Sequence, residues 1–215
     1  IQADFVPSDA TLNRLFSLHV IALPFVLVGL VAAHILALHE VGSNNPDGVE
    51  IKKNKDPKTG IPLDGIAFHP YYTVKDMVGV AGFLIIFCGV LFFAPDGGGY
   101  FLEAPNFTPA SQTNTPEHIT PAWYFGTYYA MLRATPSFVG TQIWGVIVMG
   151  AAVVILFFVP WLDKSKVKSI RYKGMLSKIA LTVFAINFVI LNYYGLQPPS
   201  DLVQLISQVG TVIYF

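Results

Sequence analysis

An apolar run near the start of the chain constrains the fold more than any other feature, because it is long enough to cross a bilayer and yet contains histidines. A spanning helix needs about 20 mostly apolar residues, and Leu15–Leu38 meets that length with His19 and His34 inside it. Three further segments qualify, and a fifth begins as a span at the end of the chain: Val74–Phe93, Ile143–Leu162, Leu176–Tyr194 and the shorter Leu202–Phe215. None alternates with period two, so the sequence predicts an all-α integral membrane protein built as a transmembrane helix bundle.

Composition agrees with that class. Hydrophobic residues make up 53% of the chain and charged residues only 12%, whereas soluble domains carry about 25% charged residues. The net charge is zero, so nothing indicates a nucleic-acid partner. Cys88 lies in an apolar run and is interpreted as a small buried hydrophobe. The chain lacks an initiator Met and a signal peptide, and it stops within an apolar stretch; we expect it to be part of a longer membrane protein.

The loops predict an orientation. Lysines and arginines gather in residues 44–72 and 163–178, whereas residues 94–142 contain only Arg133 and residues 195–201 contain none. Basic loops stay on the cytoplasmic side of a membrane. The first and third loops between spans are therefore expected inside, and the N-terminal end of this chain and the long middle loop outside.

The middle loop contains one more predicted element. In residues 120–134, Thr120 is placed as an N-cap, Pro121 as the first helical residue, and Pro136 ends the pattern. The segment is too short to span and rich in Trp and Tyr, so it is interpreted as a helix at the outer interface. A belt of anchoring aromatic residues is the alternative interpretation.

The two histidines of the first run face a common side if the helix is regular. They are fifteen positions apart, which leaves about 60° between them around the axis and about 22 Å along it. Three interpretations compete: hydrogen-bonded core histidines, a proton or ion relay, and ligands of a metal or haem within a helix bundle. No charged residue lies between the two histidines, so a relay has no intermediates across that distance. Extended redox cofactors span it more readily, and the geometry favours haems.

Four motifs in this order resemble cytochrome b of cytochrome bc complexes, in particular its C-terminal part and its bacterial type. They are "TLNRLFSLHVIALPF", "AAHILALHEVGSNNP", "FHPYYTVKD" and "NTPEHITPAWYFGTYYAMLRATP". The resemblance implies a subunit of quinol–cytochrome c reductase in the bacterial cytoplasmic membrane. That enzyme oxidises quinol at the outer side, passes electrons through two b-type haems to a quinone at the inner side, and couples this to proton translocation.

The resemblance also implies the cofactor ligands and partners. His19 would be an axial ligand of the outer, low-potential haem and His34 of the inner, high-potential haem, while the second histidine of each pair lies on an earlier helix outside this chain. Residues 1–40 would then be the last helix of a four-helix haem bundle, residues 41–75 an inner loop with a quinone site, and residues 76–215 a C-terminal membrane domain. The implied partners are the N-terminal half of cytochrome b, a Rieske-type iron–sulfur subunit, a cytochrome c-type subunit and a second copy in a homodimer.

The quinone-site residues follow from the same motifs. At the inner site the resemblance implies His39 and Asp76 as hydrogen-bonding and proton-delivery groups, alongside Ser43, Asn44, Phe68 and Lys75. Arg14 is a further expected cofactor-binding residue. Independently, "TVKD" at Thr73–Asp76 fits a capping box that would open the second span.

At the outer site the resemblance implies Pro121, Trp123, Tyr124, Phe125 and Tyr129. The family usually has Glu at the second position of this motif, where this chain has Ala122. Glu117 lies five residues upstream, but nothing in the sequence shows that it replaces that proton acceptor, and the proton exit stays open. A non-redox membrane scaffold or ion pathway with buried histidines is the alternative function.

Overall fold

The computed structural model describes residues 8–42, 45–109 and 118–215 and is helical throughout its regular elements in those ranges. It divides into two compact units, Ile1–Gly65 with Pro109–Thr115, and Ile66–Thr108 with Pro116–Phe215. Each unit is described by itself. Four helices are long and apolar enough to cross a membrane, Asp9–Val41, Tyr71–Phe93, Ile143–Leu162 and Met175–Gly195, which confirms the predicted fold class and number of full spans.

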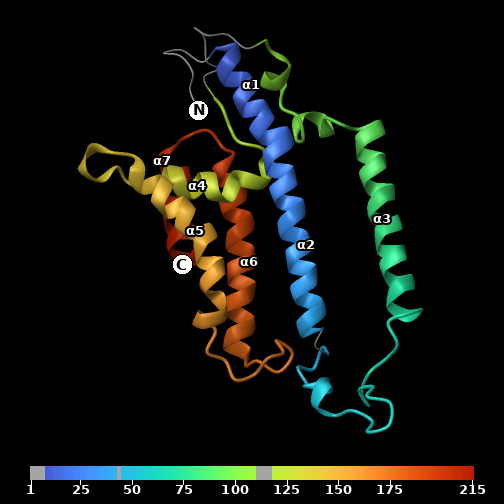
Figure 1. Cartoon of the computed structure of the whole chain (residues 1–215). Helices are drawn as coiled ribbons and strands as arrows, with labels where there is room; N and C mark the ends of the chain where they lie inside the picture. Colours follow the sequence, from blue (N-terminus) through green and yellow to red (C-terminus); the bar gives the residue numbers. More distant parts are fainter. Residues whose placement is uncertain (1–7, 43–44, 110–117) are drawn as a thin grey trace. The chain divides into compact units, whose positions relative to one another are not determined.

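The first unit is dominated by one continuous helix (Figure 1). It comprises α1 (Asp9–Ser17), a π-helical turn η1 (Leu18–Ala22) and α2 (Leu23–Val41). No residue of α2 is buried. A helix that is apolar on all sides is stable where lipid or neighbouring apolar helices surround it.

The second unit begins with α3 (Tyr71–Phe93) and continues through a loop with the 3-10 turn Ala104–Phe107. Four helices follow, which pack on one another: α4 (Gly126–Ala134), α5 (Ile143–Leu162), α6 (Met175–Gly195) and α7 (Asp201–Tyr214). Ser200 caps α7 by accepting a hydrogen bond from the Val203 amide at 3.3 Å. The predicted fifth segment is therefore a 14-residue helix within this chain.

α4 runs across the ends of α5 and α6 instead of parallel to them (Figure 1). Its buried residues Gly126, Thr127, Ala130, Met131 and Ala134 form one face. Met131 is fully buried together with Leu191 of α6. A nine-residue helix is only about 14 Å long. The expectation of a short helix that does not span is confirmed.

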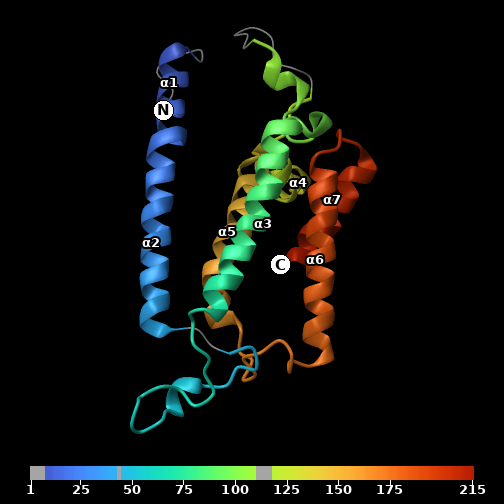
Figure 2. The same ribbon diagram turned by 90° about the vertical axis from the view of Figure 1, so that its right-hand side faces the viewer.

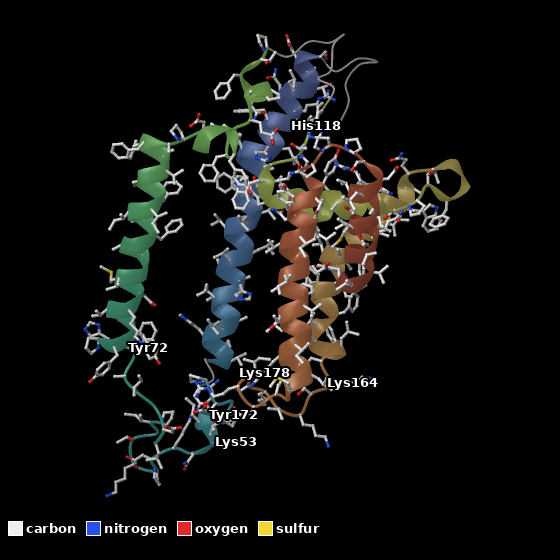
Figure 3. The ribbon with its side chains drawn as sticks, turned by 180° about the vertical axis from the view of Figure 1, so that it is seen from behind. Lys53, Tyr72, His118, Lys164, Tyr172 and Lys178 are labelled. Carbon is white, nitrogen blue, oxygen red and sulfur yellow. The ribbon has the colours of Figure 1, made fainter. Side chains whose placement is uncertain are left out.

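The basic loop between α5 and α6 lies at the opposite end of these helices from α4, as the turned view in Figure 2 also shows. Lys164, Tyr172 and Lys178 mark this end in Figure 3. Within the loop, the Lys173 ammonium donates to the Asp163 carboxylate at 2.7 Å. That hydrogen bond, with one from the Ser165 amide, lowers the pKa of Asp163 below its ordinary value.

Two predicted helix starts are wrong, because each threonine expected to cap a helix binds another side chain. Thr73 lies inside α3, whose N-cap is Pro70, and its hydroxyl is 3.3 Å from Nδ1 of His69. Thr120 donates its hydroxyl hydrogen to the Glu103 carboxylate at 2.8 Å. The helical segment after it starts as the 3-10 turn η5 (Trp123–Phe125), and Ala122 before it is not helical, with φ −50° and ψ 143°.

Candidate functional site

His19 lies in the π-helical turn, where the backbone N–H of Leu23 donates to the carbonyl of Leu18, five residues earlier. The sequence explains why the turn widens here. Pro24 has no N–H to donate to Val20, and its ring would collide with that carbonyl in a regular helix. Prolines and π-bulges are recognised causes of local helix distortion, and π-bulges are frequent at functional sites.

The π turn changes the predicted relation between His19 and His34. A π-bulge takes up one extra residue in a turn, so fifteen residues rotate the chain about as far as fourteen do in a regular helix. The angle between the two positions then becomes about 40° in the opposite sense, and the axial distance about 21 Å. The expected value of about 60° was wrong because it assumed an uninterrupted α-helix. The two histidines still share one side.

Both imidazoles are suited to ligation. They are exposed on the helix surface, and neither makes a hydrogen bond within the described part of the chain. Among the described residues no three His, Cys, Asp or Glu side chains gather into a metal site. A lone imidazole on a membrane helix suits axial ligation of haem iron, provided that the remaining ligands come from the haem and from a second histidine elsewhere. The chemistry of the donors therefore fits two haems.

The residues expected at the inner quinone site are divided between the two units. His39 lies in the last turn of α2, and Ser43 and Asn44 lie outside the described residues. Phe68, Lys75 and Asp76 belong to the second unit, at or just before the start of α3. Arg14, in the last turn of α1, is exposed.

Near the start of α3, Tyr72 contacts two of the residues expected at the inner quinone site. The Phe68 ring stacks on the Tyr72 ring with centroids 6.0 Å apart. The Lys75 ammonium lies 5.9 Å from the centroid of the same ring, within cation–π range. Tyr72, labelled in Figure 3, was not predicted as a site residue, although it stands between the predicted ones in the sequence.

Three of the residues expected at the outer site, Trp123, Tyr124 and Phe125, form a continuous aromatic group directly after Pro121. Trp123 and Tyr124 meet edge to face with centroids 5.6 Å apart, and Tyr124 and Phe125 are 4.7 Å apart. Tyr100 and Phe101 extend the group from the preceding loop, with centroids 6.1 and 6.4 Å from that of Trp123. Sequence reasoning missed these two residues because they lie twenty-one and twenty positions before Pro121.

Tyr129, on α4, is held at both ends of its side chain. Its hydroxyl donates to the Ile119 carbonyl at 3.5 Å, and the Arg133 guanidinium lies 5.3 Å from its ring centroid. Arg133 also donates to the carbonyls of Gly195 and Gln197 at 3.2 and 3.0 Å. Tyr129, the tyrosine expected to form a hydrogen bond at the outer site, is therefore hydrogen-bonded to the chain segment that precedes the aromatic group.

The backbone of α4 approaches α6 very closely. A Cβ atom added to Gly195 would collide with the carbonyl oxygen of Gly126, and one added to Gly126 would collide with the carbonyl of Asn192. Thr127 uses the same contact, donating its hydroxyl to the Phe188 carbonyl at 3.0 Å. The aromatic residues Trp123, Tyr124 and Phe125 therefore directly precede a helix, α4, that packs closely against α6.

Two family sequence models match the chain. The model described as "Cytochrome b(N-terminal)/b6/petB" matches residues 1–99, and the one described as "Cytochrome b(C-terminal)/b6/petD" matches residues 109–215. The chain belongs to the cytochrome b family. The junction between the two matches falls in the loop after α3.

Relatives and a solved structure agree with this assignment. The chain is 58% identical to cytochrome b of Allochromatium vinosum, over 100% of this chain and 52% of that protein. It is 43% identical to cytochrome b of Rhodospirillum rubrum, over 98% of this chain and 48% of that protein. A structure titled "Hyperthermophilic respiratory Complex III" matches 100% of this chain and 51% of that chain, with a TM-score of 0.84 and 32% identity. These matches confirm a cytochrome b of bacterial type and a multi-pass membrane protein, and the chain spans about half the length of these relatives.

Proposed function

We propose that this chain is the part of cytochrome b that carries one axial histidine for each of two b-type haems and most of an outer quinol site. The observation that carries the proposal is the pair His19 and His34, unpartnered within the described chain, on one side of a single apolar helix. Family membership, in both halves of the chain, is the independent support.

The residues have separate tasks in this proposal. His19 and His34 hold the haems, whose chemistry when bound is to carry single electrons between the outer and inner sides. Trp123, Tyr124 and Phe125 offer an aromatic surface for a quinol ring, together with Pro121, and Tyr129 offers a hydroxyl. His39, Ser43, Asn44, Phe68, Lys75 and Asp76 bind the inner quinone, and His39 and Asp76 deliver its protons.

Because the chain spans about half of its relatives, the complete assembly belongs to the proposal as well. The activity is that of a quinol–cytochrome c oxidoreductase, in the bacterial cytoplasmic membrane. The rest of cytochrome b supplies the second histidine of each haem. A Rieske-type iron–sulfur subunit accepts one electron of each quinol, a cytochrome c-type subunit receives it, and two copies form a dimer. The match to a respiratory Complex III structure and the 42% identity to the Bradyrhizobium diazoefficiens protein named "Cytochrome b/c1" support these partners.

The test is a dithionite-reduced minus oxidised spectrum of the purified native complex, with haem stoichiometry. We expect two b haems per copy of this chain. His34→Ala should remove one b-type component and abolish inner-site reduction, because a haem that loses an axial histidine loses its low-spin spectrum. His39→Ala is the matched control on the same helix and should leave both components in place.

Two results would contradict the proposal. Normal spectra and turnover in His34→Ala would show that His34 is not a haem ligand and would remove the haem interpretation of this helix. Two b haems per copy in this 215-residue chain expressed alone would show that no outside histidines are needed.

A further inference from the structure

A carboxylate from a distant part of the chain meets the segment that leads into the outer site. The Thr120 hydroxyl donates to Oε1 of Glu103 at 2.8 Å, and both residues are partly buried. Glu103 precedes the 3-10 turn Ala104–Phe107, seventeen positions before Thr120. Thr120 is followed directly by Pro121 and Ala122.

The same short segment carries the other polar contact of this site. Ile119, next to Thr120, accepts the hydrogen bond of the Tyr129 hydroxyl through its carbonyl oxygen. His118, labelled in Figure 3, begins the described part of this segment. Two side chains that can move protons thus meet this segment. Glu103, from the loop after α3, is hydrogen-bonded to Thr120, and Tyr129, from α4, is hydrogen-bonded to the adjacent Ile119.

Aromatic contacts hold the Glu103 loop against the site. The rings of Tyr100 and Phe101 lie beside the Trp123 ring, at centroid distances of 6.1 and 6.4 Å. Because these two residues lie only two and three positions before Glu103, the backbone of the loop passes the aromatic group just before it reaches Glu103. The hydrogen bond between Glu103 and Thr120 therefore lies next to the aromatic group.

Quinol oxidation needs such a group. A quinol that gives up two electrons also releases two protons, and a positioned carboxylate is a common acceptor. Residues 121–125 contain no ionisable carboxylate. Glu117 lies outside the described residues. Within the described chain, the carboxylate hydrogen-bonded to this segment is Glu103.

We propose that Glu103 accepts, through the Thr120 hydroxyl, one of the protons released by quinol at the outer site. The inference rests on the proposed function. The quinol O–H bond breaks and its proton binds the Thr120 oxygen, while the hydrogen already shared with Glu103 passes to Oε1 and leaves a neutral carboxylic acid. In the proposed function, the iron–sulfur partner and the outer b haem would supply the chemistry that accepts one electron each. Glu103 is only partly buried, so it then returns the proton to outer water.

The experiment measures oxidation of decylubiquinol by the purified complex carrying Glu103→Gln. The amide oxygen still accepts the Thr120 hydrogen bond, so the fold is kept while the base is lost. We expect kcat to fall by about 10²-fold or more with little change in KM, and both b-haem components to remain. Thr120→Val should cause a similar loss, because it removes the relay and leaves the carboxylate in place. The double variant should be no slower than the slower single variant, because both act on one route.

Two comparison variants make the result specific. Asp96→Asn removes a carboxylate from the same loop and should leave kcat unchanged, and Glu103→Asp should restore part of the lost rate. Unchanged kcat in Glu103→Gln would overturn the inference, as would a loss in Glu117→Gln that exceeds the loss in Glu103→Gln. Absence of b haem and of quinol oxidation in the unmodified complex would instead overturn the proposed function itself.

Discussion

At Gly195 the lack of a side chain lets α6 pass against the carbonyl oxygen of Gly126, where α4 begins. Arg133 adds a hydrogen bond at the same contact, because its guanidinium donates to the Gly195 carbonyl at 3.2 Å. Two helices can cross this closely only where neither carries a Cβ atom at the crossing point. The position of the outer-site aromatic residues thus depends on two glycines that take no part in the chemistry.

Gly195→Ala should destabilise the complex and weaken the outer site. The added methyl group forces α4 away from α6, and overpacking of this kind costs about 1–3 kcal/mol. We expect a lower thermal midpoint in detergent solution, measured by intrinsic fluorescence, and a raised KM for quinol. Gly150→Ala in α5 is the control, since an added Cβ meets no atom within 4 Å there. Equal midpoints for the two variants would show that the crossing is looser than the structure indicates.

At the scale of elements, the first helix is the most informative, because its π turn determines how His19 relates to His34. The π turn holds one residue more than a regular α-helical turn. In the sequence, its cause is Pro24. A helix that only crosses lipid does not need such a distortion. The proposed role of His19 as a haem ligand accounts for the π turn.

Pro24→Ala should remove the π turn, because residue 24 can again donate to the Val20 carbonyl. His19 would then rotate by about 100° relative to His34, and we expect one b-haem component to be lost or its midpoint potential to shift. Redox titration of the purified complex measures this. Deleting Ile21 in the same variant leaves a regular helix with the two ligands fourteen positions apart, and should restore the native spectrum.

Pro160→Ala is the control for a proline that lies inside a membrane helix without a nearby histidine. It should leave both components unchanged. If Pro24→Ala behaves like Pro160→Ala, with native spectrum and potentials, the π turn does not orient His19.

At the scale of the molecule, the second unit has two chemically distinct ends. The loop of residues 163–174 is basic and connects α5 to α6, whereas α4 and the aromatic group lie at the other end of those helices (Figure 1). This arrangement agrees with the orientation predicted from loop charge, because a single pair of spanning helices separates the two ends.

Cysteine labelling tests the orientation. In a Cys88→Ser background, Ser137→Cys marks the α4 end and Ser165→Cys the basic loop. The positive-inside rule leads us to expect an impermeant maleimide to label Ser137→Cys from the periplasmic side and Ser165→Cys only in inside-out vesicles. The reverse pattern would place the proposed quinol site on the cytoplasmic side and refute the assignment of outer and inner sites.

Much of the candidate site was predictable, but only as a set of residues. His19, His34 and the aromatic group could be picked out because histidines are costly in an apolar span and because short motifs resemble a family. Tyr100, Phe101, Glu103 and Arg133 could not, since each acquires its role through a contact with another segment. Tyr72 was missed although its contacts with Phe68 and Lys75 are local. Thr120 illustrates the difference: its sequence context indicates an N-cap, whereas in the structure its hydroxyl binds a carboxylate seventeen residues away.

The sequence by itself determined the spans, their number and the contrast between basic and neutral loops, because these follow from local composition and the cost of placing polar backbone and charge in lipid. Only the tertiary structure decided the crossing of α4 over α6 and the contact between Glu103 and Thr120. These depend on which distant segments meet. The π turn at His19 belongs to the same group: Pro24 is visible in the sequence, but whether its helix kinks, breaks or widens depends on which carbonyl each neighbouring N–H reaches.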